Sequence, residues 1–81
     1  MTRLYVLEVP ENDGVVQVAA QDPAVTVDKV GPYFRISAAD EIVVDRRATG
    51  ARHAVWYSAI AGLEGSRIVQ HDKDALRVAP R

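Results

Sequence analysis

The fold class of this chain depends on the stretch His53-Ala54-Val55-Trp56-Tyr57-Ser58-Ala59-Ile60-Ala61, which fits both a strand and a helix. As a strand, it places Val55 and Tyr57 on one face and Trp56 and Ile60 on the other. As a helix, it brings Trp56 and Ile60 together at a spacing of four residues, and a glycine follows as a stop signal. The β-branched and aromatic centre of the stretch, with turn signals on both sides, favours the strand.

The rest of the chain reads as short strands separated by turns. Residues 4–9 are rich in β-branched and aromatic side chains, and their apolar residues fall at odd and even positions, as in a strand covered on both faces. Glu11-Asn12-Asp13-Gly14 predicts a tight turn, because Asp-Gly supplies the positive φ angles that hairpins need. Further strands are expected at residues 15–20, 25–28, 33–38 and 41–47, and at 67–71 and 75–79 after a loop at 62–65.

This regular spacing of strands predicts an all-β fold in a single domain that spans residues 1–81. We expect a small seven- to eight-stranded antiparallel meander that forms a barrel or sandwich, SH3-like or OB-like in general architecture. The alternative is an α+β fold with one helix near residues 52–62. Such folds host unrelated functions, so the prediction concerns architecture alone.

The composition excludes several kinds of site. The chain has no cysteine, so disulfides and cysteine-ligated zinc or iron–sulfur centres are excluded. No serine lies in a G-x-S-x-G elbow, and the glycines form no phosphate-binding loop. We therefore expect no cofactor, no metal site and no catalytic residue. Because the chain shows no export signal and no stretch near the roughly 20 apolar residues of a membrane span, we expect a cytoplasmic protein with no membrane partner.

Charge is distributed unevenly along the chain. The formal net charge is −1, which argues against strong electrostatic binding of nucleic acid. Residues 1–45 carry three basic and eight acidic side chains, whereas residues 46–81 carry seven basic and three acidic ones. This asymmetry predicts either two faces of opposite sign or acidic strands that pair with basic ones.

Residues suited to recognition gather between positions 45 and 58. On a small barrel, exposed rings that stack on bases and arginines that contact phosphates would form a single-strand binding surface. The competing interpretation is structural, because so small a protein needs its aromatic residues for packing. The candidate binding residues are Arg46, Arg47, Arg52, His53, Trp56 and Tyr57.

The two histidines, His53 and His71, are candidates for acid–base chemistry or for holding a ligand. They do not lie in a spaced metal-binding motif. They therefore support only a third hypothesis, a small enzyme or ligand-binding protein.

A surplus of apolar residues indicates self-association or a protein partner. Residues 4–9 and 53–60 both carry apolar side chains on two faces, which is more hydrophobic surface than one small barrel needs to cover. The alternative is that these two strands are central in the fold and covered on both faces. The leading hypothesis is therefore a non-enzymatic β-barrel interaction module or small accessory subunit. We expect it to act as a homo-oligomer or through a protein partner, with nucleic-acid binding as the alternative.

Overall fold

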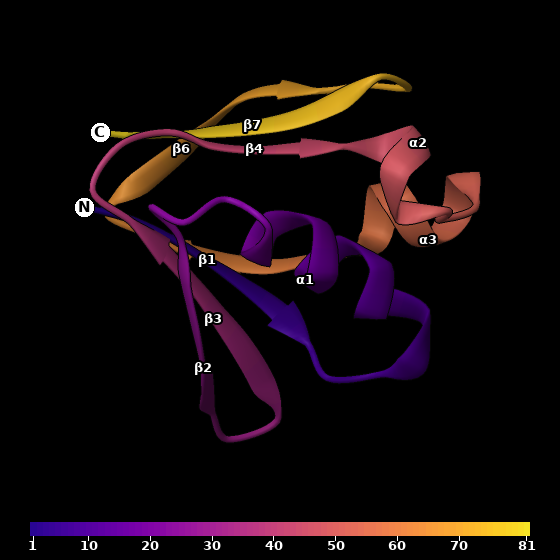
Figure 1. The fold of residues 1–81 in the computed structure, drawn as a ribbon, viewed down its shortest axis with the longest axis horizontal. Helices are drawn as coiled ribbons and strands as arrows, with labels where there is room; N and C mark the ends of the chain where they lie inside the picture. The colour runs from indigo at the N-terminus through magenta and orange to yellow at the C-terminus, as the bar shows by residue number, and fades with distance from the viewer.

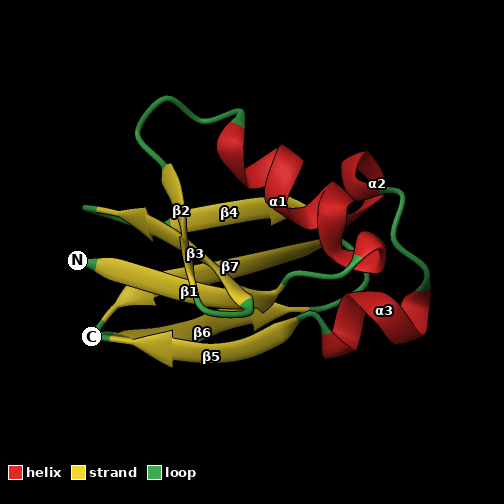
Figure 2. Ribbon diagram, turned by 90° about the horizontal axis from the view of Figure 1, so that it is seen from below, coloured by secondary structure: helices red, strands yellow, loops and turns green.

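Seven strands and four helical segments make up the computed structural model, which describes all of residues 1–81 (Figures 1 and 2). The strands are β1 (Thr2–Leu7), β2 (Thr26–Val30), β3 (Tyr33–Ala38), β4 (Ile42–Asp45), β5 (Ile60–Glu64), β6 (Ser66–His71) and β7 (Ala75–Pro80). The helical segments are the 3-10 helix η1 (Pro10–Asn12) and the α-helices α1 (Asp13–Ala20), α2 (Arg46–Thr49) and α3 (His53–Ser58). Figure 2 shows the helices at the end of the molecule opposite the two chain termini.

The strands form two antiparallel sheets, one in the order β2-β3-β1-β5 and one in the order β4-β7-β6. In the first sheet Leu4 lies opposite Ile36, and in the second Val44 lies opposite Leu76. All four side chains are buried, so the two sheets face each other across one core. Figure 1 shows the sheets diverging away from the chain termini, with α1 in the opening between them.

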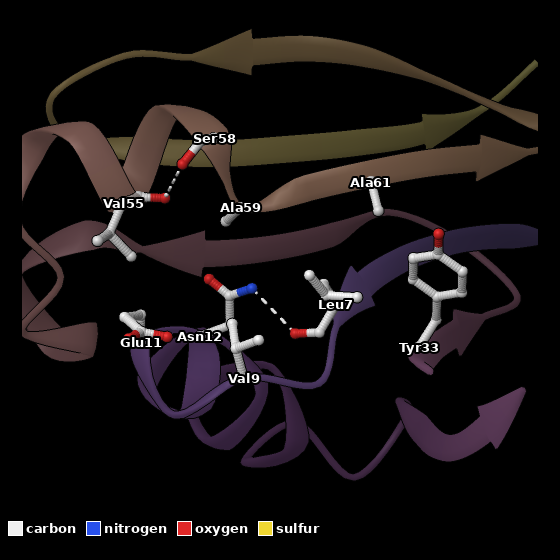
Figure 3. Close-up of a pocket in the computed structure, with 9 residues that line it drawn as sticks. All are labelled: Leu7, Val9, Glu11, Asn12, Tyr33, Val55, Ser58, Ala59 and Ala61. Carbon is white, nitrogen blue, oxygen red and sulfur yellow. Dashed lines mark hydrogen bonds between the residues drawn. The ribbon is translucent and has the colours of Figure 1, made fainter. Parts of the chain in front are cut away.

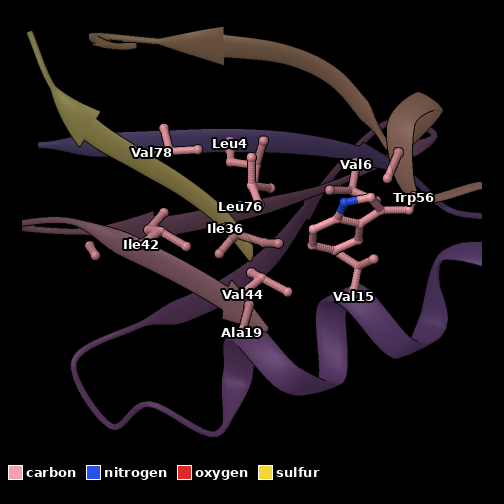
Figure 4. Close-up of a cluster of buried hydrophobic side chains, with 12 residues drawn as sticks. Leu4, Val6, Val15, Ala19, Ile36, Ile42, Val44, Trp56, Leu76 and Val78 are labelled. Atoms are coloured by element: carbon pink, nitrogen blue, oxygen red, sulfur yellow. The ribbon is translucent and has the colours of Figure 1, made fainter. Parts of the chain in front are cut away.

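One apolar core joins both sheets to α1 and α3. Trp56 is 1% exposed, and its ring lies between the side chains of Val6 and Val15 in the view of Figure 4. As the largest fully buried side chain, it removes more apolar area from water than any other core residue. The buried apolar residues are Leu4, Val6, Val15, Ala19, Ile36, Ala38, Ile42, Val44, Trp56, Ala59, Leu76 and Val78.

The helix α1 occupies residues for which the sequence predicts a hairpin turn and a strand at 15–20, so both predictions were wrong. The valines of this segment also have helical spacing, and Val15 and Ala19, four residues apart, are both buried. Pro10 is the first residue of η1, just before α1. Proline suits the first position of a helix, because a backbone N–H there would have no acceptor within the helix.

Gly14 permits a close approach between α1 and α2. A Cβ atom at this position would lie 2.1 Å from the main-chain oxygen of Thr49. Gly14 does not have a positive φ angle, so the turn conformation predicted for it is absent. The glycine is therefore required by packing.

The stretch that was ambiguous in the sequence is divided between a helix and a strand. His53–Ser58 form α3 and Ile60 begins β5, so the predicted strand is wrong over its first six residues. The helical alternative near residues 52–62 is correct for α3. The helix places Trp56 in the core and the half-buried Val55 beside it, while Tyr57 stays exposed.

Several other boundaries also differ from the prediction. The strands expected at 4–9 and 25–28 are present but shifted, as β1 at Thr2–Leu7 and β2 at Thr26–Val30. β4 ends at Asp45, where a strand was predicted to continue, because the Asp45 carboxylate accepts the Ala48 N–H at 3.0 Å and caps α2 (Arg46–Thr49). β5 runs through most of the predicted loop at residues 62–65. Only Gly65, with φ at 61°, remains as the turn between the two sheets.

The fold is mostly β rather than all-β, with 47% of the residues in strands and 26% in helices. The prediction of a small antiparallel β-rich fold is confirmed, and the strands expected at 33–38, 67–71 and 75–79 are present as β3, β6 and β7. The predicted meander of seven to eight strands is wrong, because β1 lies between β3 and β5 in the first sheet. The two sheets do not close into a barrel, so the SH3-like or OB-like form is not supported. None of the helices is both long enough and apolar enough to span a bilayer.

Candidate functional site

The six residues predicted to bind a ligand lie on α2, on α3 and in the loop between them. His53 and Tyr57 are exposed neighbours on α3, with ring centroids 5.2 Å apart. Tyr57 also lies 5.1 Å from the ring of His71 in β6, so the structure brings both histidines into one aromatic cluster. Trp56, in contrast, is buried in the core.

The surroundings of the two histidines contain no arrangement suited to a metal ion. No three His, Asp or Glu side chains lie close enough together to hold one. Nε2 of the half-buried His71 lies 3.2 Å from the Trp56 carbonyl oxygen, whereas His53 is exposed. The hypothesis of an enzyme that uses both histidines stays a prediction.

Arg46 connects α2 to the turn between β6 and β7, because its Nε donates a hydrogen bond to the Lys73 carbonyl oxygen. Arg47 and Arg52 are exposed, and neither takes part in an ion pair. With Arg46 engaged and the tryptophan buried, the nucleic-acid alternative rests on Arg47, Arg52 and Tyr57. It also stays a prediction.

Four ion pairs connect charged side chains of the fold. They are Arg3–Glu64, Lys29–Glu8, Arg35–Asp28 and Arg77–Glu41. Only the last joins an acidic residue of the first half to a basic residue of the second half. The predicted pairing of the two halves therefore explains one pair of the four.

Part of the outer face of the first sheet is polar and internally paired. Glu64 accepts hydrogen bonds from Arg3 at 2.8 Å and from the Tyr5 hydroxyl at 3.2 Å, and these two donors hold the pKa of Glu64 below its usual value. Arg35 likewise lowers the pKa of Asp28 through a bidentate hydrogen bond. Each charged side chain here has an oppositely charged partner, so this part of the face offers no unpaired charge, although Nε of Arg3 is buried without a hydrogen-bond partner.

An open pocket of about 380 Å³ lies at the other end of the same sheet, where β1 leads into η1 and α3 leads into β5. Figure 3 shows the lining side chains converging from these elements. We call it the α3 pocket. It is lined by Leu7, Val9, Glu11, Asn12, Tyr33, Val55, Ser58, Ala59 and Ala61.

The polar groups of the α3 pocket have defined orientations. Asn12 is 6% exposed, and its Nδ2 donates to the Leu7 carbonyl oxygen at 2.9 Å. In Figure 3 its Oδ1 points away from that bond, toward α3. Ser58 Oγ donates to the Ala54 carbonyl oxygen at 2.7 Å, and the Val55 carbonyl oxygen is a second, longer acceptor at 3.3 Å (Figure 3). Glu11 forms no ion pair.

The α3 pocket opens onto exposed apolar side chains. Leu7 pairs with Tyr33 across β1 and β3, and Tyr33 pairs with Val30 across β3 and β2, so the three lie side by side on the outer face. They are 40%, 37% and 41% exposed, respectively. We call these three residues the apolar row.

The sequence does not locate the α3 pocket, although it contains one signal for it. The two stretches with surplus apolar residues, 4–9 and 53–60, are the ones that supply most of the lining. The sequence predicts a turn at Glu11 and Asn12, and no local pattern connects them to residues more than forty positions away. Of the predicted site residues, none lines the pocket.

Comparison with known proteins gives a likeness of fold. No family model matches the chain, and no curated protein matches it. Among solved structures, it is similar to one chain of a structure described as the phenol hydroxylase–regulatory protein complex, with a TM-score of 0.78. The match covers 99% of this chain and 98% of that chain at 10% sequence identity. The two chains therefore share a fold from end to end.

Proposed function

We propose that this chain is a small non-enzymatic accessory protein that acts by binding a larger protein partner. The observation that carries the proposal is the α3 pocket, whose apolar lining continues into the exposed apolar row. A hollow beside adjoining exposed apolar side chains is typical of protein interfaces, where a partner side chain fills the hollow. The internally paired polar groups of the same face would form the rim of such an interface.

The shared fold supports a class of partner. A chain with this fold and nearly the same length is present in a complex of phenol hydroxylase with a regulatory protein. We therefore propose an enzyme as the partner, with hydroxylases as the first class to test, and regulation of that enzyme as the role.

Site-directed photo-crosslinking tests the proposal. A photoreactive phenylalanine analogue replaces Tyr33 of the apolar row in one variant. In a control variant it replaces Val43, which is 44% exposed on the outer face of the second sheet. We expect the Tyr33 variant to form one predominant adduct in extracts of the source cells, and the Val43 variant to form none. Mass spectrometry then identifies the partner, whose activity is measured with and without the purified chain.

Two results would contradict the proposal. Equal cross-linking at both positions would mean that the apolar row is not a specific interface, and no adduct at Tyr33 would mean that nothing binds there. An adduct of twice the mass of the chain would identify a second copy instead, in agreement with the homo-oligomer expected from the apolar surplus.

A further inference from the structure

At the end next to η1, the side chains that line the α3 pocket present hydrogen-bond acceptors. The Asn12 amide is fixed in orientation, because the Leu7 carbonyl oxygen only accepts hydrogen bonds and so selects Nδ2 as its neighbour. The remaining Asn12 atom, Oδ1, is an acceptor without a partner in the chain. Because Asn12 is 6% exposed, Oδ1 is turned into the pocket from a nearly buried side chain (Figure 3).

The other polar side chains at this end of the α3 pocket also act as hydrogen-bond acceptors. A hydroxyl group has one hydrogen, and Ser58 directs its hydrogen to the Ala54 carbonyl oxygen, so only its lone pairs face outward. The Glu11 carboxylate lies beside Asn12 and has acceptor oxygens alone. Tyr33, whose hydroxyl can donate or accept, lies at the opposite end of the pocket in Figure 3. A ligand that reaches Glu11 and Asn12 must therefore bring donors.

We infer that the α3 pocket receives an arginine side chain of the partner protein. Arginine combines an apolar stem, which would lie along Val9, Val55 and Ala59, with a guanidinium group that carries five donors and no acceptor. The negative charge of Glu11 complements its positive charge. Arginine is also enriched at protein interfaces, where a planar group can bind a carboxylate through two parallel hydrogen bonds.

The occupant belongs to a protein, because the mouth of the pocket continues into the apolar row, which a free small cation would leave uncovered. This inference rests on the proposed function and specifies the chemistry of the partner. It adds a requirement that an apolar interface alone does not impose, namely a cation at Glu11.

Nuclear magnetic resonance titration with two small probes tests the chemistry separately from the partner. The first probe is n-butylguanidinium, which imitates an arginine side chain. The second is n-butylurea, which has a similar shape without the charge. We expect butylguanidinium to shift the amide signals of residues 7–12 and 55–61, with a dissociation constant on the order of 1–10 mM. Butylurea should bind about tenfold more weakly.

A pair of charge-neutralising variants provides the matched control. Glu11→Gln should weaken butylguanidinium binding by about five- to tenfold, because a charge-assisted hydrogen bond becomes a neutral one. Asp13→Asn changes the net charge equally but lies outside the pocket lining, and it should change binding by less than about twofold. Both substitutions are at exposed positions, so both variants should fold.

The outcomes separate this inference from the proposed function. Equal binding of the two probes, absence of shifts in the pocket, or equal effects of the two variants would overturn the inference. If cross-linking at Tyr33 then still identifies a partner, the accessory role stands and the pocket holds a neutral side chain. If butylguanidinium binds as expected but no partner is cross-linked, the protein origin of the occupant and the proposed function both fail.

Discussion

The indole nitrogen of Trp56 donates a hydrogen bond to the main-chain carbonyl oxygen of Asp72 at 2.6 Å, which connects α3 to the turn between β6 and β7. A second contact reinforces the connection, because His71 Nε2 lies 3.2 Å from the Trp56 carbonyl oxygen. Helices as short as α3 are unstable in isolation and depend on such tertiary contacts. Since α3 supplies one wall of the α3 pocket, the Trp56–Asp72 hydrogen bond also positions the candidate site.

Replacing Trp56 by phenylalanine should destabilise the protein. The substitution keeps an aromatic ring in the core but removes the N–H group and leaves the Asp72 carbonyl oxygen without this donor. We expect a loss of about 2–4 kcal/mol in the free energy of unfolding, from the missing hydrogen bond and the smaller ring together. Urea denaturation followed by circular dichroism measures it. Tyr57→Phe on the exposed side of α3 is the control, with an expected change within about 0.5 kcal/mol.

Gly14→Ala should destabilise the protein, although replacing glycine by alanine within a helix usually stabilises it. Alanine is normally about 1 kcal/mol more favourable than glycine at helical positions. Here the new Cβ atom would lie 2.1 Å from the Thr49 oxygen, so α1 and α2 must separate. We expect a destabilisation of about 1–3 kcal/mol in urea denaturation. Gly62→Ala, where nothing lies within 4 Å of the new atom, should be close to neutral, and a stabilised Gly14→Ala variant would disprove the packing role.

Gly14 also illustrates what the sequence could and could not reveal about the fold. Asp13-Gly14 between two valine-rich runs is a strong hairpin signal, and local patterns alone favour it. The helix is preferred because Val15 and Ala19 then enter the space between two diverging sheets, a space that no local pattern describes. Strands that pair within hairpins, such as β6 and β7, were predictable because turn and alternation signals coincide there.

The candidate site was less predictable than the fold. The residue types around Trp56 predict a binding site there, but the structure buries Trp56. The apolar surplus at residues 4–9 and 53–60 is the part of the sequence pattern that corresponds to the pocket. The acceptor at the buried end of the pocket is Oδ1 of Asn12, which faces α3 because Nδ2 of the same amide is hydrogen-bonded to the Leu7 carbonyl oxygen. Such a feature arises from tertiary structure, so residue types and spacing cannot indicate it.

The Asp72 carboxylate should make stability depend on pH. It accepts the backbone N–H groups of Ala75 and Asp74, which hold the pKa of Asp72 below its usual value in the folded protein. Because its pKa is lower in the folded protein, the Asp72 carboxylate stabilises the folded state, and this contribution is complete at pH values above its pKa in the unfolded chain, about 3.9. The contribution is lost as the pH falls through the pKa of Asp72 in the folded protein. Wild type should therefore exceed Asp72→Asn in stability at pH 7, and the difference should shrink below about pH 4.

Denaturation midpoints of wild type and Asp72→Asn between pH 7 and pH 2 measure this difference. Asp40→Asn, at an exposed position before β4, is the control and should follow wild type across the range. A constant gap between wild type and Asp72→Asn at all pH values would mean that the charge of Asp72 does not contribute.

Thr2→Val should stabilise the protein. Thr2 is fully buried, and its hydroxyl oxygen has no hydrogen-bond partner within the chain. Valine has nearly the same shape and avoids the cost of burying an unpaired hydroxyl, so we expect a gain of about 1–2 kcal/mol. Thermal denaturation measures it, with Thr26→Val at an exposed position of β2 as the control. A destabilised Thr2→Val variant would show that the hydroxyl is bonded after all, for example to a buried water molecule.

Leu7→Asp should separate binding from folding. Leu7 is 40% exposed at the junction of the apolar row and the α3 pocket, so a carboxylate there would be desolvated against an apolar partner surface. We expect this cost to exceed the attraction of the carboxylate for a cation in the pocket. We expect at least a tenfold loss of affinity for the partner identified by cross-linking, because central apolar contacts carry much of the binding energy.

Val43→Asp introduces the same charge at a similarly exposed strand position on the other sheet, and it should bind like wild type. Both variants should lose similar, small amounts of stability in urea denaturation, since neither side chain belongs to the core. Equal loss of affinity in the two variants would move the interface away from the α3 pocket, and unaltered affinity in Leu7→Asp would remove this residue from it.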